Sequence, residues 1–182
     1  RNHNIYSFAS LDVDRMYFDH GFAEGDHADK ALFLTFPSDR EHHWEHPPVI
    51  LALGLMNWPD VAPWAGSRTG KRDPGYVAFK QRAAARMLEA VEKAIPDHAG
   101  HLRCIETSTP LTNRDYTGAV EGAIYGMRHG MERWGRYALH PRTKIDNLVL
   151  TGHSVLMPGI VGVTIGGFIT CSHLLGFEAL FD

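Results

Sequence analysis

The segment Glu41–His46 is the first place in the chain where residue types and spacing could do chemistry. His42 and His46 stand four residues apart, and a helix would place both imidazoles on one face, as a metal-binding pair requires. The prolines at 37, 47 and 48 favour a loop instead. The segment lacks an HExxH motif, and the sequence indicates no third ligand. We therefore predict no metal site and keep a metal-dependent hydrolase as a minor alternative.

The pentapeptide Gly152–Leu156 offers a nucleophile. Ser154 follows Gly152 as in a nucleophile elbow, but the elbow requires G-x-S-x-G because its turn has no room for a side chain at the last position. Leu156 occupies that position. A serine hydrolase is therefore a second minor alternative.

The same residues fit a strand, a glycine turn and a helix. We predict a strand over residues 145–152 that ends at Gly152. A turn is predicted at residues 158–159, and an apolar helix is predicted over residues 161–175. A helix start presents unpaired backbone N–H groups, which favour a negative or electron-rich ligand group. Gly162 and Gly166 have the GxxxG spacing, which in a soluble chain lets a helix lie close against a sheet or a nucleotide.

The preceding part of the chain predicts strands over residues 5–10, 31–36, 49–56 and 101–107. The run 49–56 is continuously apolar, which is typical of a strand covered on both faces. Residues 75–95 predict a helix that Pro96 ends. Its apolar residues recur at three- and four-residue steps and so share one face: Tyr76, Phe79, Ala83, Met87, Val91 and Ile95. These elements predict an α+β fold, with a boundary near Pro141.

Composition excludes few function classes. The chain has 182 residues, 44% hydrophobic and 21% charged, with a net charge of -3, so it can bury a core and has no basic face for nucleic acid. Two cysteines and the absence of an apolar leader run predict a reducing, cytoplasmic location. A substrate that partitions into lipid would add peripheral membrane contact.

Two blocks of sequence, in this order, carry a resemblance. The first comprises residues 108–116 and 121–126, and the second comprises residues 147–152 and 158–163. Together they resemble the retinol saturase group, within the wider phytoene desaturase and carotenoid isomerase family of flavoproteins. The resemblance covers most of the chain and is strongest from residue 101 onward.

The resemblance implies a C-terminal fragment of a two-domain FAD-dependent oxidoreductase. Residues 1–140 would be part of a mixed-sheet substrate domain, and residues 141–182 the last strand and helix of a Rossmann-like FAD domain. In this family an N-terminal GxGxxG grips the FAD pyrophosphate, and this chain has no such motif. The missing N-terminal FAD-binding portion is therefore the expected partner, and the chain alone is expected to be inactive.

The resemblance also implies which residues contact FAD. The expected cofactor-binding residues are Gly152, His153, Ser154, Gly159, Val161, Gly162, Val163 and Tyr125. Many relatives have an acidic or amide side chain just after the glycine that ends the strand. His153 and Ser154 stand there in this chain, and both can hydrogen-bond but neither carries a fixed negative charge.

The implied reaction saturates, desaturates or isomerises C=C bonds of a retinoid- or carotenoid-type polyene or a similar lipid-like substrate. The flavin would carry the electrons, and the protein would orient the substrate and exclude water. Candidate proton donors are Tyr125, Asp115 and His153, and no residue is assigned as catalytic. Candidate walls of an apolar slot, each of which could equally be core, are Phe33, Phe36, Leu51, Leu53, Leu55, Met56 and Trp58. The main alternative is a non-enzymatic module that binds an apolar ligand or a partner.

Overall fold

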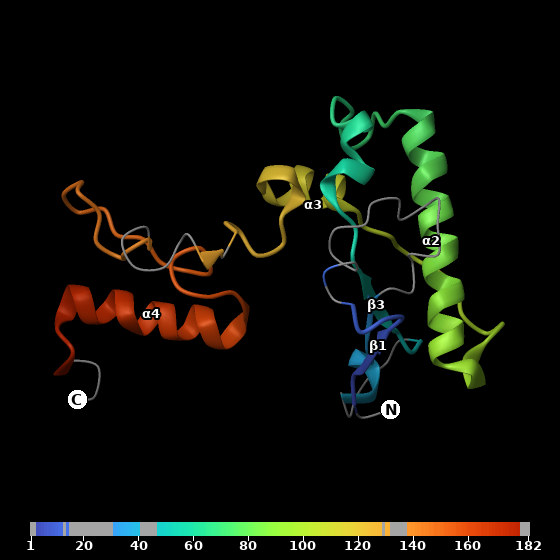
Figure 1. Ribbon diagram of the computed structural model, residues 1–182, viewed down its shortest axis with the longest axis horizontal. Helices are drawn as coiled ribbons and strands as arrows, with labels where there is room; N and C mark the ends of the chain where they lie inside the picture. Colours follow the sequence, from blue (N-terminus) through green and yellow to red (C-terminus); the bar gives the residue numbers. More distant parts are fainter. Residues whose placement is uncertain are drawn as a thin grey trace. The chain divides into compact units, whose positions relative to one another are not determined.

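The computed structural model of the protein describes residues 3–12, 14, 31–40, 47–128, 130–131 and 138–178. The chain forms two compact units, Arg1–Gly122 and Ala123–Asp182, and each is described by itself (Figure 1). The expected division into functional domains at residue 141 stays a prediction. The Glu41–His46 segment lies outside the described residues.

The first unit contains an antiparallel sheet of three strands in the order β1-β2-β3. The strands are β1 (Ile5–Phe8), β2 (Ala31–Thr35) and β3 (Leu51–Gly54). Tyr6 lies opposite Phe33, and Phe33 lies opposite Leu53. The described part of the sheet is thus antiparallel rather than mixed, while the α+β class predicted from the sequence is confirmed.

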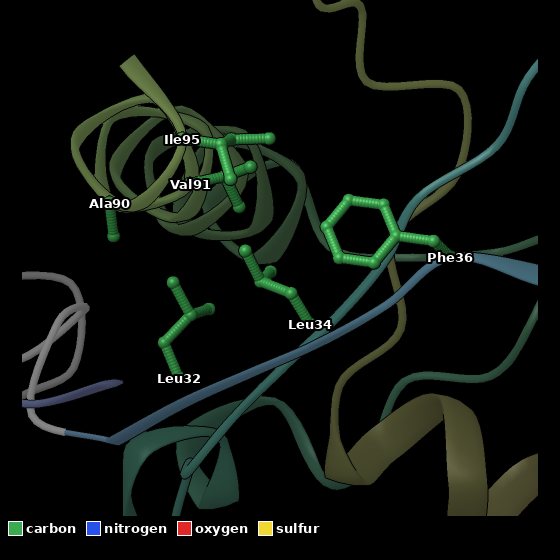
Figure 2. Close-up of a cluster of buried hydrophobic side chains, with 6 residues drawn as sticks. All are labelled: Leu32, Leu34, Phe36, Ala90, Val91 and Ile95. Atoms are coloured by element: carbon green, nitrogen blue, oxygen red, sulfur yellow. The ribbon is translucent and has the colours of Figure 1, made fainter. Parts of the chain in front are cut away.

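Helix α2 (Pro74–Ala94) covers one face of this sheet. Asp73 caps the helix by accepting the Gly75 N–H at 2.7 Å, and the helix ends just before Pro96 as predicted. Side chains from β2 and from the end of α2 point toward one another (Figure 2). Six buried residues form this core: Leu32, Leu34, Phe36, Ala90, Val91 and Ile95. The core exists because alternate β2 side chains meet the apolar stripe of the helix.

The other face of the sheet is apolar and exposed. Side chains alternate between faces along a strand, so one set of residues lies opposite the core. We call this set the outer sheet face: Tyr6, Phe8, Phe33, Leu51 and Leu53. The exposed fractions are 65% for Tyr6 and 48% for Leu53. The expectation that residues 49–56 are covered on both faces is therefore wrong, because among the described residues only β2 pairs with β3 and α2 covers only one face.

Helix α3 (Pro110–Thr117) was not predicted from the sequence. Its start is fixed by Thr109, whose N–H donates to Thr112 Oγ1 at 3.2 Å and whose own Oγ1 hydrogen-bonds the Tyr76 hydroxyl at 2.7 Å. Gly118 ends it in the left-handed conformation, with φ of 70°. The strand expected over residues 101–107 is wrong, because that segment is irregular and mostly exposed, without a neighbouring strand in the described part.

In the second unit the predicted helix is confirmed as α4 (Gly159–Leu175). The strand expected over residues 145–152 is wrong. Arg142 and Val149 form a single bridge, and Leu148 N donates to Ile145 O at 3.2 Å around Asn147, whose φ is 61°. The segment therefore turns back on itself, because its backbone pairs with residues just upstream rather than with a separate strand.

Candidate functional site

Helix α4 lies against the segment that leads into it. Its three buried residues, Gly162, Gly166 and Thr170, recur every four positions. A Cβ on Gly162 would lie 2.5 Å from the Met157 carbonyl oxygen. The Thr170 hydroxyl donates to Leu150 O at 3.1 Å and to Gly166 O at 2.9 Å. The GxxxG spacing thus allows close packing of the helix against its own chain, which explains Gly162 without any cofactor.

At two other glycines of the predicted site, the backbone is open to its surroundings. Gly152 and Gly159 have φ of 93° and 83°, and a Cβ on either would meet nothing within 4 Å. Between them, residues 153–155 form a turn closed by Val155 N donating to Gly152 O at 3.1 Å. The backbone at both positions is therefore accessible to a ligand on the side where a side chain would stand.

The start of α4 is also accessible. Pro158 precedes the helix and provides no side-chain cap hydrogen bond. The first N–H groups of a helix have no partner within the helix and carry a partial positive charge. Val161 is 70% exposed at this end, and Val163 is 38% exposed. A planar electron-rich group could therefore lie across the helix start and the open glycines, so these residues fit a flavin ring.

The end of the first sequence block, residues 123–126, meets the second block within the second unit. A Cβ on Gly126 would collide with Ser154 Oγ and would lie 2.5 Å from His153 Nε2. The N–H of Met127 donates to Ser154 Oγ at 3.3 Å. The structure thus brings the loop that carries Tyr125 beside His153 and Ser154, as expected if these residues contribute to one site. Tyr125 itself is 59% exposed.

Asp115, a candidate proton donor, lies in an ionic network of the first unit. Its carboxylate accepts from Arg72 and from Arg114, each at 2.7 Å, and from the Thr69 N–H at 3.0 Å. Burial by itself raises the pKa of Asp115, but the hydrogen bonds from Arg114 and Thr69 and the charge of Arg72 together lower the pKa to about 2. Asp115 is therefore ionised at neutral pH and does not serve as a proton donor.

This network positions α3, and sequence reasoning missed its role. Arg114 also donates to Ala65 O at 2.7 Å and to Ser67 O at 3.2 Å, so α3 is attached to the loop that precedes α2. At the start of α3, Pro110 lies so close to Gly122 that a Cβ on Gly122 would overlap the Pro110 carbonyl. Pro110 after Thr109, with Gly118 eight residues on, is a start-and-stop signal that could have revealed α3.

The two hydrolase alternatives gain no support. Within the described ranges no three His, Cys, Asp or Glu residues are grouped so that they could hold a metal ion. The Ser154 hydroxyl accepts a backbone N–H in a structural contact. Both cysteines are free thiols, and in the part of the chain that the structure describes no helix has the length and apolar character needed to span a bilayer.

Comparison with known proteins identifies the class of protein to which the chain is related. The chain is similar in sequence to four retinol saturase-like proteins, which confirms the resemblance carried by the two blocks. No family model matches the chain, and no solved structure does.

The relatives are proteins named all-trans-retinol 13,14-reductase. The chain is 25% identical to the Danio rerio protein and 28% identical to the human protein, in each case over 94% of this chain and 30% of the relative. It is 29% identical to the Macaca fascicularis protein over 79% of this chain and 25% of the relative. The chain therefore spans at most about 30% of the length of these relatives.

Proposed function

We propose that the chain is the C-terminal part of an FAD-dependent oxidoreductase that acts on C=C bonds of a retinoid-type polyene. The observation that carries this proposal is the similarity to all-trans-retinol 13,14-reductases across 94% of the chain. Adding hydrogen across a C=C bond requires a two-electron carrier, which no amino-acid side chain provides. A bound flavin would supply that hydride chemistry.

The residues proposed to hold the flavin are those that leave backbone accessible. Gly152 and Gly159 would allow the ring and the ribityl chain to approach the main chain. The start of α4 would stabilise negative charge on the ring through its partial positive charge. Val161 and Val163, both partly exposed, would contact the ring, and His153 would offer a hydrogen-bonding group to the ribityl hydroxyls. Gly162 would contribute indirectly, by keeping α4 close to Met157.

The outer sheet face is the proposed wall for the apolar substrate. Three of the residues expected to line an apolar slot, Phe33, Leu51 and Leu53, lie on this face. Leu55, just beyond β3, is 37% exposed. The others serve the core instead, because Phe36 is buried beneath α2 while Met56 and Trp58 pack around Tyr76 and Phe79. An exposed apolar surface of this kind typically marks a ligand or interaction site.

The chain's own residues would bind, orient and protonate the substrate. With Asp115 ionised, Tyr125 and His153 are the proposed proton donors, since the loop that carries Tyr125 lies beside His153. The missing N-terminal FAD-binding portion would grip the pyrophosphate of FAD, and the protein would be cytoplasmic with peripheral membrane contact. A second candidate function, an apolar-ligand-binding module without flavin, is favoured only by the exposed outer sheet face.

A pair of glycine variants tests the flavin site. Gly152→Ala and Gly100→Ala both place a methyl group in open space at positive φ, 93° and 75° respectively. Both should therefore lower stability by a similar amount, about 1 kcal/mol. Only Gly152→Ala should displace the flavin, because only its methyl group would point into the proposed site. We expect the full-length protein to purify with the visible absorption of an oxidised flavin and Gly152→Ala to lose most of it.

The measurements are the flavin absorbance per protein and the thermal unfolding midpoint. Equal flavin content in both variants would contradict the proposed site. A colourless wild-type protein that carries extracted lipid would contradict the oxidoreductase and support the apolar-ligand-binding module.

A further inference from the structure

We infer that Ser154 is a positioning residue that holds the Tyr125–Met127 loop in place and thereby shapes the flavin site. This inference rests on the proposed function for the flavin, but its contact is visible in the chain itself. Ser154 is one of the residues expected to contact FAD, and its hydroxyl oxygen accepts the Met127 N–H at 3.3 Å.

The contact depends on a glycine. Gly126 has φ of 72°, and a Cβ at this position would overlap Ser154 Oγ and reach 2.5 Å from the His153 ring. A side chain at residue 126 would therefore push the loop away from the turn at residues 153–155. The absence of a side chain at Gly126 and the acceptor on Ser154 act together, and we call this arrangement the 126/154 contact.

The 126/154 contact links segments that are far apart in sequence. Residue 127 precedes residue 154 by 27 positions, so the hydrogen bond joins the segment that carries Tyr125 to the segment that carries His153. Both residues are proposed proton donors. The turn that carries Ser154 begins at Gly152, where Val155 N donates to its carbonyl oxygen. Moving Ser154 would therefore also move the backbone proposed to face the flavin.

In this arrangement the neighbouring side chains of His153 and Ser154 have different proposed roles. Because Ser154 Oγ accepts a backbone N–H from the Tyr125–Met127 loop, we assign Ser154 to fixing that loop. We assign the contact with the ribityl chain to His153. This role can be distinguished from a role in which Ser154 contacts only the flavin. In that case, loss of the hydroxyl would leave the hydrogen-exchange rate of the Met127 amide unchanged.

The test compares Ser154→Ala with Ser154→Thr and Ser172→Ala in the full-length protein. Ser172 is a matched control in the same unit, since its hydroxyl donates within α4, to Ile169 O at 2.7 Å. In Ser154→Ala we expect hydrogen exchange of the Met127 amide to accelerate about tenfold, the factor for one lost hydrogen bond. The affinity for flavin should fall by a similar factor, and the visible absorption band of the bound flavin should shift.

Ser154→Thr should restore both quantities, and Ser172→Ala should change neither. Gly126→Ala, which keeps the serine hydroxyl but forces it away, should reproduce the effects of Ser154→Ala. An unchanged Met127 exchange rate in Ser154→Ala would overturn the inference, as would faster exchange with unaltered flavin retention. A wild-type protein that binds no flavin would overturn the proposed function instead, and the Met127 exchange rate would still decide whether the contact exists.

Discussion

Asp115 shows at the scale of one residue how a motif can be structural rather than catalytic. It belongs to the block that carries the family resemblance, and its residue type suits acid–base chemistry. The structure instead surrounds it with Arg72, Arg114 and Thr69. Sequence alone could not reveal this, because Thr69 and Arg72 lie more than forty positions upstream. The charged partners of a residue follow from tertiary packing and not from its neighbours in the chain.

The low pKa of Asp115 predicts a pH dependence of stability. The folded-state pKa of about 2 is below the ordinary aspartate pKa of 3.8, so the ionised form is stabilised by folding. This contribution is fully present above about pH 4 and is lost as the pH falls toward 2. Its size is on the order of 2 kcal/mol, from the shift between the two pKa values.

The substitution Asp115→Asn should therefore lower the free energy of unfolding at pH 7 by about 2 kcal/mol. The difference between variant and wild type should shrink as the pH approaches 2. Chemical denaturation across this pH range measures both effects. Glu89→Gln, which removes an exposed carboxylate from α2, is the control and should have little effect. A constant difference at all pH values would contradict the assigned ion pairs.

At the scale of elements, two helices and the strands β1, β2 and β3 were predicted correctly from the sequence, whereas two further predicted strands are not found. Residues 75–95 and 161–175 correspond to α2 and α4, because a helix is made of local hydrogen bonds and its periodicity is visible in sequence. Residues 101–107 and 145–152 form no strand, since a strand requires a partner strand and neither segment has one among the described residues. Helix α3 escaped prediction because it is short, with only Leu111 buried.

The packing of α3 predicts a difference between two glycines of similar conformation. Gly118 and Gly122 have φ of 70° and 68°, but a Cβ on Gly118 would meet nothing within 4 Å whereas one on Gly122 would overlap Pro110. Gly118→Ala should cost about 1 kcal/mol from the backbone conformation alone. Gly122→Ala should cost at least about 2 kcal/mol more, because the loop must move away from the helix start.

Denaturation midpoints of the two variants measure this difference. Because the two φ values are similar, the conformational cost is the same in both variants. The difference between their free energies of unfolding therefore reports the contact of Gly122 with Pro110. Equal destabilisation would mean that Gly122 is not packed against the start of α3.

At the scale of the whole molecule, glycines of one predicted site have different surroundings. Gly152 and Gly159 have the open backbone that the flavin motif implies, whereas Gly162 is occupied by packing against Met157. Glycines look alike in sequence, and only the surroundings of each absent side chain distinguish a ligand contact from a helix contact. The outer sheet face was similarly hidden, because apolar residues in a strand do not reveal which face is covered.

The outer sheet face allows substrate binding to be tested apart from flavin binding. Leu53 is 48% exposed on β3, an edge strand of this sheet, so Leu53→Asp should fold. A charge beside an apolar polyene would oppose its binding, and we expect the affinity for all-trans-retinol to fall at least about tenfold. Flavin content should stay at the wild-type level, because the proposed flavin residues belong to the second unit.

Val77→Asp is the matched control, since Val77 is 42% exposed on α2 and lies off the sheet. Titration with all-trans-retinol, followed by its fluorescence, compares the two variants with the wild-type protein. If both substitutions weaken binding equally, the loss reflects added negative charge and the outer sheet face is not the substrate wall. A loss confined to Leu53→Asp, with flavin retained, would place the polyene on the sheet and separate substrate recognition from cofactor binding.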